Sequence, residues 1–84
     1  MSDLELKVYQ AADLHSILIE NPGKSGNASV EIFSITGTLV YSSGTELLPG
    51  KNHLITGKME TGIYLYRISL KGTSNSGKLL ITDH

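Results

Sequence analysis

Three histidines, His15, His53 and His84, are the best candidates for metal ligands in this 84-residue sequence. Metal sites commonly place histidines at short fixed spacings, such as i and i+4 on one face of a helix. None of the three stands at such a spacing from another, and the chain has no cysteine. We therefore interpret them as surface or loop residues, and we expect no metal or other cofactor.

Two further stretches contain residue types used in catalysis or phosphate binding. Asp13, His15 and Ser16 could form a nucleophilic triad on paper, but no Gly-x-Ser-x-Gly motif supports one. Gly23-Lys24-Ser25 matches the end of a P-loop, yet Leu18 occupies the position where that motif needs its first glycine. We interpret this second stretch as a hairpin loop and predict that the protein is not an enzyme.

Length and composition narrow the class of protein. The chain is long enough for one domain, residues 1–84, which would bury roughly 60–65% of its unfolded surface. The net charge is −1 with acids and bases interspersed, so no nucleic-acid partner is expected. No apolar run approaches the roughly 20 residues of a transmembrane segment. The start of the chain lacks the features of a signal peptide, so a signal for export would lie upstream of it.

Alternation of apolar and polar residues dominates the chain and predicts β-strands. One strand follows Gly62, and its inward face carries Tyr64, Tyr66, Ile68 and Leu70. Six others are expected near residues 4–9, 16–20, 28–35, 38–42, 52–56 and 78–82. Clusters of Gly, Asn, Ser and Pro separate them as turns. This order favours an all-β fold, a small antiparallel immunoglobulin-like β-sandwich of about seven strands, with a small barrel as the alternative.

Two glycines occupy positions that should favour a residue without a Cβ. Thr36-Gly37 is interpreted as a two-residue hairpin turn that needs a positive φ at Gly37, and Gly62 as a bend at the entry to a strand. Arg67 should point away from the core into solvent, whereas Tyr64 and Tyr66 should cover one end of the core with their hydroxyls at its wet edge.

Three blocks of residues in a fixed order resemble the C-terminal sorting domain of type IX secretion cargo, also called the Por secretion system tail. They are Val30–Val40, Met59–Ile68 and Gly77–Ile81. A fourth block, near the start, departs from the family pattern. There Val8-Tyr9 is followed by Gln10-Ala11-Ala12 in place of Pro-Asn-Pro, and His15 replaces the usual Asp.

The resemblance implies a non-enzymatic sorting module that directs an attached cargo through the type IX secretion system. The implied partners are the outer-membrane translocon, its shuttle proteins and a sortase-like peptidase. The implied localisation is the periplasm in transit, then the cell surface or the medium. The residues matched to the sorting motif are Gly37, Val40, Gly62, Tyr64, Arg67, Ile68, Lys78 and Leu80.

Two functional hypotheses remain open at this point. For a sorting module, we expect recognition of an exposed edge strand near residues 78–82, with Arg67 and Lys78 as polar contacts. Such edges would also allow two copies to pair as a dimer. The alternative is an immunoglobulin-like spacer or adhesion module, which would bind glycan or protein through aromatic and polar residues gathered at one end of the sandwich.

Overall fold

The protein is all-β. The computed structural model describes residues 6–11 and 15–82, and these contain seven strands and no helix. The strands are β1 (Lys7–Gln10), β2 (Ser16–Asn21), β3 (Gly26–Ser34), β4 (Leu39–Leu47), β5 (Gly50–Ile55), β6 (Gly62–Leu70) and β7 (Thr73–Ile81). The predicted fold class and strand number are confirmed. Leu4 and Glu5 of the first expected strand lie outside the described residues.

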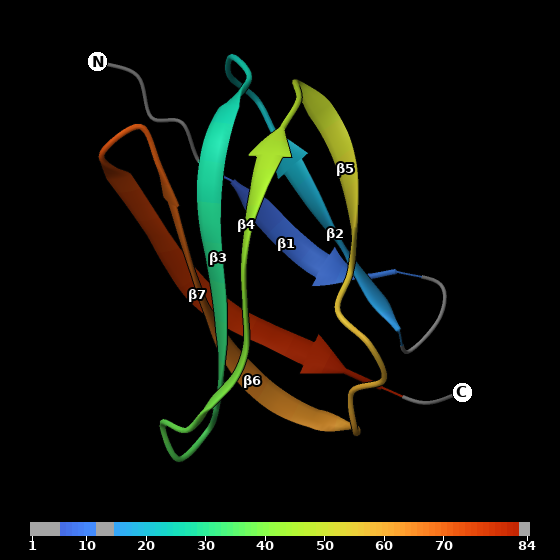
Figure 1. Ribbon diagram of the computed structural model, residues 1–84. Helices are drawn as coiled ribbons and strands as arrows, with labels where there is room; N and C mark the ends of the chain where they lie inside the picture. The colour runs from blue at the N-terminus through green and yellow to red at the C-terminus, as the bar shows by residue number, and fades with distance from the viewer. Residues whose placement is uncertain (1–5, 12–14, 83–84) are drawn as a thin grey trace.

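The strands form two antiparallel sheets that face each other (Figure 1). One sheet has the order β1-β2-β5, and the other has the order β4-β3-β6-β7. Because β2 and β3 belong to different sheets, residues 22–25 form a crossover connection, and their interpretation as a hairpin loop was wrong. No helix long and apolar enough to cross a membrane occurs in the described part of the chain.

The core lies between the two sheets and consists mainly of β-branched and leucine side chains. Ile17 and Ile19 of β2 are fully buried against Val30 and Ile32 of β3, with Ile68 of β6 also at zero exposure. These residues alternate with exposed or half-buried neighbours, as expected for strands with one face in a core. The alternation in the sequence therefore identified the inward face of both sheets correctly.

Two strands are longer than the sequence indicated. β4 continues to Leu47 and β7 begins at Thr73, although both stretches are rich in Gly, Ser and Thr and were interpreted as turns. Pairing with the neighbouring strands β3 and β6 provides the backbone hydrogen bonds that extend them, so tertiary context overrides the weak local preference. The turn between β6 and β7 is only Lys71-Gly72, with φ values of 52° and 80°, the pattern of a type I′ hairpin.

Candidate recognition surface

β6 is an interior strand of the four-stranded sheet and divides the motif residues between its two faces. Ile68 is fully buried and Tyr64 packs against the core, as the alternation predicted. The Tyr64 hydroxyl donates a hydrogen bond of 2.8 Å to the carbonyl oxygen of Glu60 at the edge of the core. Both residues therefore stabilise the core. Ile68 is not accessible to a partner protein.

Arg67 points to the opposite, outer face, where it contacts β3. Its Nη2 lies 2.7 Å from Oε1 of Glu31, and its Nε donates to the same oxygen at 3.0 Å. Glu31 and Arg67 are direct cross-strand partners, which brings the two charges together. The guanidinium carbon also lies 5.8 Å from the ring centroid of Phe33, within the range of a cation–π contact. The ion pair is solvent-exposed and worth about 1 kcal/mol at most, but it fixes the direction of Arg67.

An apolar surface begins beside this arginine at Leu65, and we call it the outer-face patch. Its cross-strand pairs are Phe33 with Leu39, Phe33 with Leu65, and Ile63 with Leu80. Leu39, Ile63 and Leu80 are 49%, 48% and 58% exposed. Lys78 stands opposite Leu65 at the margin of the patch. The patch therefore crosses all four strands and is bordered by two cationic side chains.

Gly37 ends the β3–β4 hairpin, but the loop is longer than predicted. The Ser34 N–H donates to the Thr38 carbonyl at 2.7 Å, and the Gly37 N–H donates to the Ser34 carbonyl at 2.9 Å. These bonds enclose three residues, 35–37, so the predicted two-residue turn was wrong. The φ of Gly37 is 96°, which three-residue loops need at their last position.

Val40 and Gly62 shape the same end of the sandwich. The β3–β4 register shifts after Ile32, whose partner is Tyr41, and Val40 is the residue skipped by that shift, as in a β-bulge. Gly62 begins β6 with a φ of 153°, a conformation that residues with a Cβ rarely adopt. Val40 and Tyr64 line a common cavity of about 260 Å³, so two of the motif residues meet there.

Gln10 makes a contact that the sequence did not predict. Its Nε2 donates to the carbonyl oxygen of Thr82 at 2.8 Å, and its Oε1 accepts from the Thr82 N–H at 3.0 Å. A side-chain amide thus pairs with the backbone directly after β7, as a neighbouring strand would. The edge expected to be free over residues 78–82 is therefore occupied at its last residue.

The histidines and serines form no recognisable catalytic set among the described residues. Nε2 of His53 lies 2.6 Å from the hydroxyl oxygen of Ser16, which is nearly buried between strands. Asp13 and His84 lie outside the described residues. In the chain from 6 to 11 and from 15 to 82, no three His, Asp or Glu side chains are grouped closely enough to hold a metal ion.

The structure thus brings Arg67, Lys78 and Leu80 to one surface, and it places Ile68 and Tyr64 on the opposite side of the same sheet. Sequence reasoning found Leu80 but missed the other apolar members of the outer-face patch, which are Phe33, Leu39, Ile63 and Leu65. One signal for them existed, because odd and even positions of Ile63-Tyr64-Leu65-Tyr66, which face opposite sides of the strand, are all apolar or aromatic. A strand of that kind has two covered faces or one exposed apolar face.

Comparison with known proteins assigns the chain to a protein family. The model of the secretion system C-terminal sorting domain family matches residues 12–82. No curated protein gives a significant match. The matched family consists of sorting signals, as opposed to catalytic domains, and implies contact with the secretion machinery and export toward the cell surface. The family match favours the sorting module and gives no evidence for the alternative of a spacer or adhesion module. The resemblance found in the sequence is therefore confirmed, and the chain belongs to the family of secretion system C-terminal sorting domains, the sorting signals of type IX secretion.

Proposed function

We propose that the secretion machinery recognises the outer face of the four-stranded sheet together with the outer edge of β7. In this proposal the residues 1–84 act as one non-enzymatic domain attached to a cargo. The domain crosses the periplasm, docks on the outer-membrane translocon and its shuttle proteins, and is removed by a sortase-like peptidase. The cargo then reaches the cell surface or the medium.

The outer-face patch carries this proposal. Contiguous apolar surface on a small protein commonly marks an interaction site, particularly where polar residues surround it. Here Ile63 and Leu80 form an exposed apolar pair across β6 and β7. Lys78 stands next to this pair on the same face, and Arg67 lies beyond Leu65. Three of these four residues belong to the motif that identifies the family, although their side chains contribute little to the core.

The edge of β7 offers a second means of recognition. The β6–β7 hairpin closes on the pair Leu70–Thr73, and hydrogen-bonded pairs alternate along an antiparallel ladder. The N–H and C=O groups of Ser74, Ser76, Lys78 and Leu80 are therefore expected to point away from β6. An extended segment of a partner, or β7 of a second copy in a dimer, could add a strand along this edge.

A reporter assay tests both the sorting role and the proposed surface. Residues 1–84 are fused to a reporter that carries its own periplasmic signal, in a host with a type IX secretion system. We expect the reporter at the cell surface or in the medium, and we expect removal of residues 80–84 to retain it in the periplasm. A wild-type fusion that stays in the periplasm would contradict the sorting role of this domain.

Matched serine variants separate the surface from the fold. Ile63→Ser and Leu80→Ser together should reduce export severalfold, because they remove two exposed side chains of the outer-face patch. Ile55→Ser changes a side chain that is 72% exposed on β5 of the other sheet, and it should leave export unchanged. Thermal melts establish that all variants fold. If the double variant is exported as well as Ile55→Ser, recognition lies elsewhere on the domain, and the sorting role of the domain is unaffected.

A further inference from the structure

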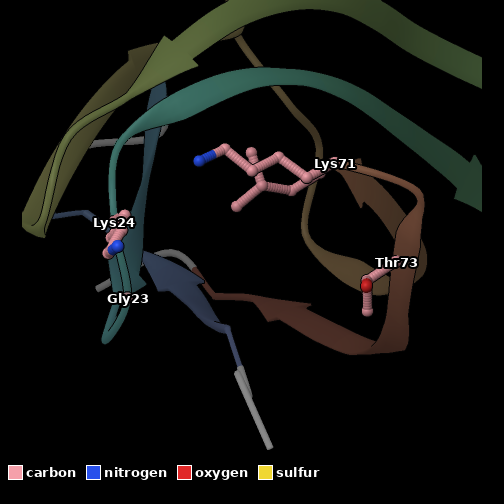
Figure 2. Close-up of a pocket in the computed structure, with 5 residues that line it drawn as sticks. Gly23, Lys24, Lys71 and Thr73 are labelled. Atoms are coloured by element: carbon pink, nitrogen blue, oxygen red, sulfur yellow. The ribbon is translucent and has the colours of Figure 1, made fainter. Parts of the chain in front are cut away.

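A cavity of about 460 Å³ opens at the end of the sandwich opposite to Gly62 (Figure 2). The β2–β3 connection forms one wall with Gly23 and Lys24, and the β6–β7 hairpin forms the other with Leu70, Lys71 and Thr73. Its volume falls within the range of roughly 300–1,000 Å³ typical of small-molecule sites. None of its lining residues belongs to the outer-face patch, so it is a separate feature of the molecule.

The wall that carries Lys24 is fixed by a buried side chain. Asn21 is only 2% exposed, and its Oδ1 accepts a hydrogen bond of 3.0 Å from the Gly23 N–H. Its Nδ2 donates to the Lys24 carbonyl at 3.1 Å. Both functional atoms of the Asn21 amide thus hold the connection in one conformation, so this wall is formed before any ligand arrives.

The opposite wall positions Lys71 by an unusual backbone and by the absence of a side chain. Lys71 has a φ of 52°, the one positive value found for a non-glycine residue in the described chain. Its side chain reaches from the hairpin across the cavity toward the β2–β3 connection (Figure 2). A Cβ on Gly26 would lie 2.7 Å from Lys71 Cε, so the glycine leaves room for this path of the lysine side chain.

Two positive charges therefore border an apolar cavity. Leu70 and the aliphatic parts of the lysines provide the apolar surface, and Thr73 adds a hydroxyl. Neither Lys24 nor Lys71 has an acidic side chain as a partner within residues 6–11 and 15–82. A ligand that complements both properties has an anionic head group and a short apolar chain.

We propose that this cavity binds an amphipathic anion, with its head group between Lys24 and Lys71 and its apolar chain against Leu70. The proposal does not depend on the sorting role of the outer-face patch. A ligand with about ten heavy atoms should bind with a dissociation constant on the order of 1 mM. Binding should weaken as salt is raised, because the charges are solvent-accessible.

Titration of the isotope-labelled full chain followed by amide NMR shifts tests this site. Octanoate and octyl phosphate should both shift the amides of Gly23, Lys24, Lys71 and Thr73, and the ratio of their affinities identifies the preferred head group. 1-Octanol, which has the same chain without charge, should bind at least severalfold more weakly. Equal shifts with octanol would overturn the proposal, because they would identify a merely apolar groove.

Variants test the role of each cation. Lys24→Gln and Lys71→Gln should each weaken octanoate binding about fivefold, the effect expected for one fully water-exposed ion pair at about 4 Å. Gly26→Ala keeps both charges but displaces the Lys71 side chain, so it should also weaken binding. Lys58→Gln, at the other end of the sandwich, is the matched control and should have no effect.

One result would contradict the assignment to an anion. It is unchanged affinity in both Lys24→Gln and Lys71→Gln, which would remove the electrostatic basis of the site.

Discussion

Replacing Gln10 by alanine removes the amide that joins β1 to the end of β7. Gln10 and its partner Thr82 are 72 positions apart in the sequence, and their contact connects one sheet with the other. The contact comprises the bonds of 2.8 Å and 3.0 Å to the Thr82 backbone and a further one of 3.3 Å from the Thr82 hydroxyl to Oε1. Because the site is partly buried, water can replace these partners only in part.

The expected cost follows from the number of bonds. A neutral hydrogen bond contributes about 1 kcal/mol net, and alanine regains part of this because ordering a glutamine side chain costs up to about 2 kcal/mol of entropy. We therefore expect Gln10→Ala to lower the free energy of unfolding by about 1–2 kcal/mol. For a domain of this size, each 1 kcal/mol corresponds to a decrease of about 4–8 °C in Tm.

Urea denaturation combined with amide hydrogen exchange measures this effect. Global stability should fall as stated, and the Thr82 amide should lose protection more than the amides of β3 do. Gln10→Glu keeps an oxygen that can accept from the Thr82 N–H, but it replaces the Nε2 donor by a charged oxygen that faces the Thr82 carbonyl, so it should not restore the stability lost in Gln10→Ala. Lys7→Ala, on the exposed side of the same strand, should change stability by less than about 0.5 kcal/mol. Unchanged protection of Thr82 in Gln10→Ala would refute the role of this contact.

Three further predictions follow from the described contacts. Gly62→Val should lower the free energy of unfolding by about 1–3 kcal/mol, because its φ of 153° is rarely adopted by a residue with a Cβ. Gly44→Ala is the control and should leave stability unchanged, since a Cβ at residue 44 has space. Equal melting temperatures of the two variants would contradict the strain at Gly62. Ile68→Ala should cost about 2–5 kcal/mol in denaturation because it empties part of a fully buried site, and a cost near zero would show that the side chain is not in the core. Partial burial and the neighbouring Glu20 carboxylate raise the pKa of Tyr9 above 10.0, so the folded state holds this proton more tightly than the unfolded state does. Stability should therefore be retained below pH 10 and decrease as the pH rises through the pKa of the folded state, and Tyr9→Phe should flatten that decrease in denaturation curves measured above pH 9.

Much of the fold could be predicted because its signal is local. Side chains on successive residues of a strand point to opposite faces, so Ile17, Ile19, Val30 and Ile32 identify the core without knowledge of the partners. The same rule placed Arg67 outward and Ile68 inward. The positive φ of Gly37 was also predicted, since turns impose it locally, and so was a bend at Gly62 that favours a residue without a Cβ.

The ends of the strands could not be predicted in this way. The segments that extend β4 to Leu47 and begin β7 at Thr73 have turn-like compositions, and they are strands because β3 and β6 lie beside them. The length of the Gly37 loop depends on which residue pairs with Ser34, and the bulge at Val40 depends on the register with β3. These are properties of pairs of strands, and no single strand specifies them.

The sequence by itself determined the all-β class, the inward faces of the strands and the family, because periodicity and motif order are properties of the linear chain. Only the tertiary structure decided which residues form surfaces together. The patch that joins Leu39, Ile63 and Leu80, the contact of Gln10 with Thr82, and the cavity between Lys24 and Lys71 each unite residues far apart in sequence. The physical reason is that β-sheets are assembled by non-local pairing, so the neighbours of a side chain are set by register and by sheet order.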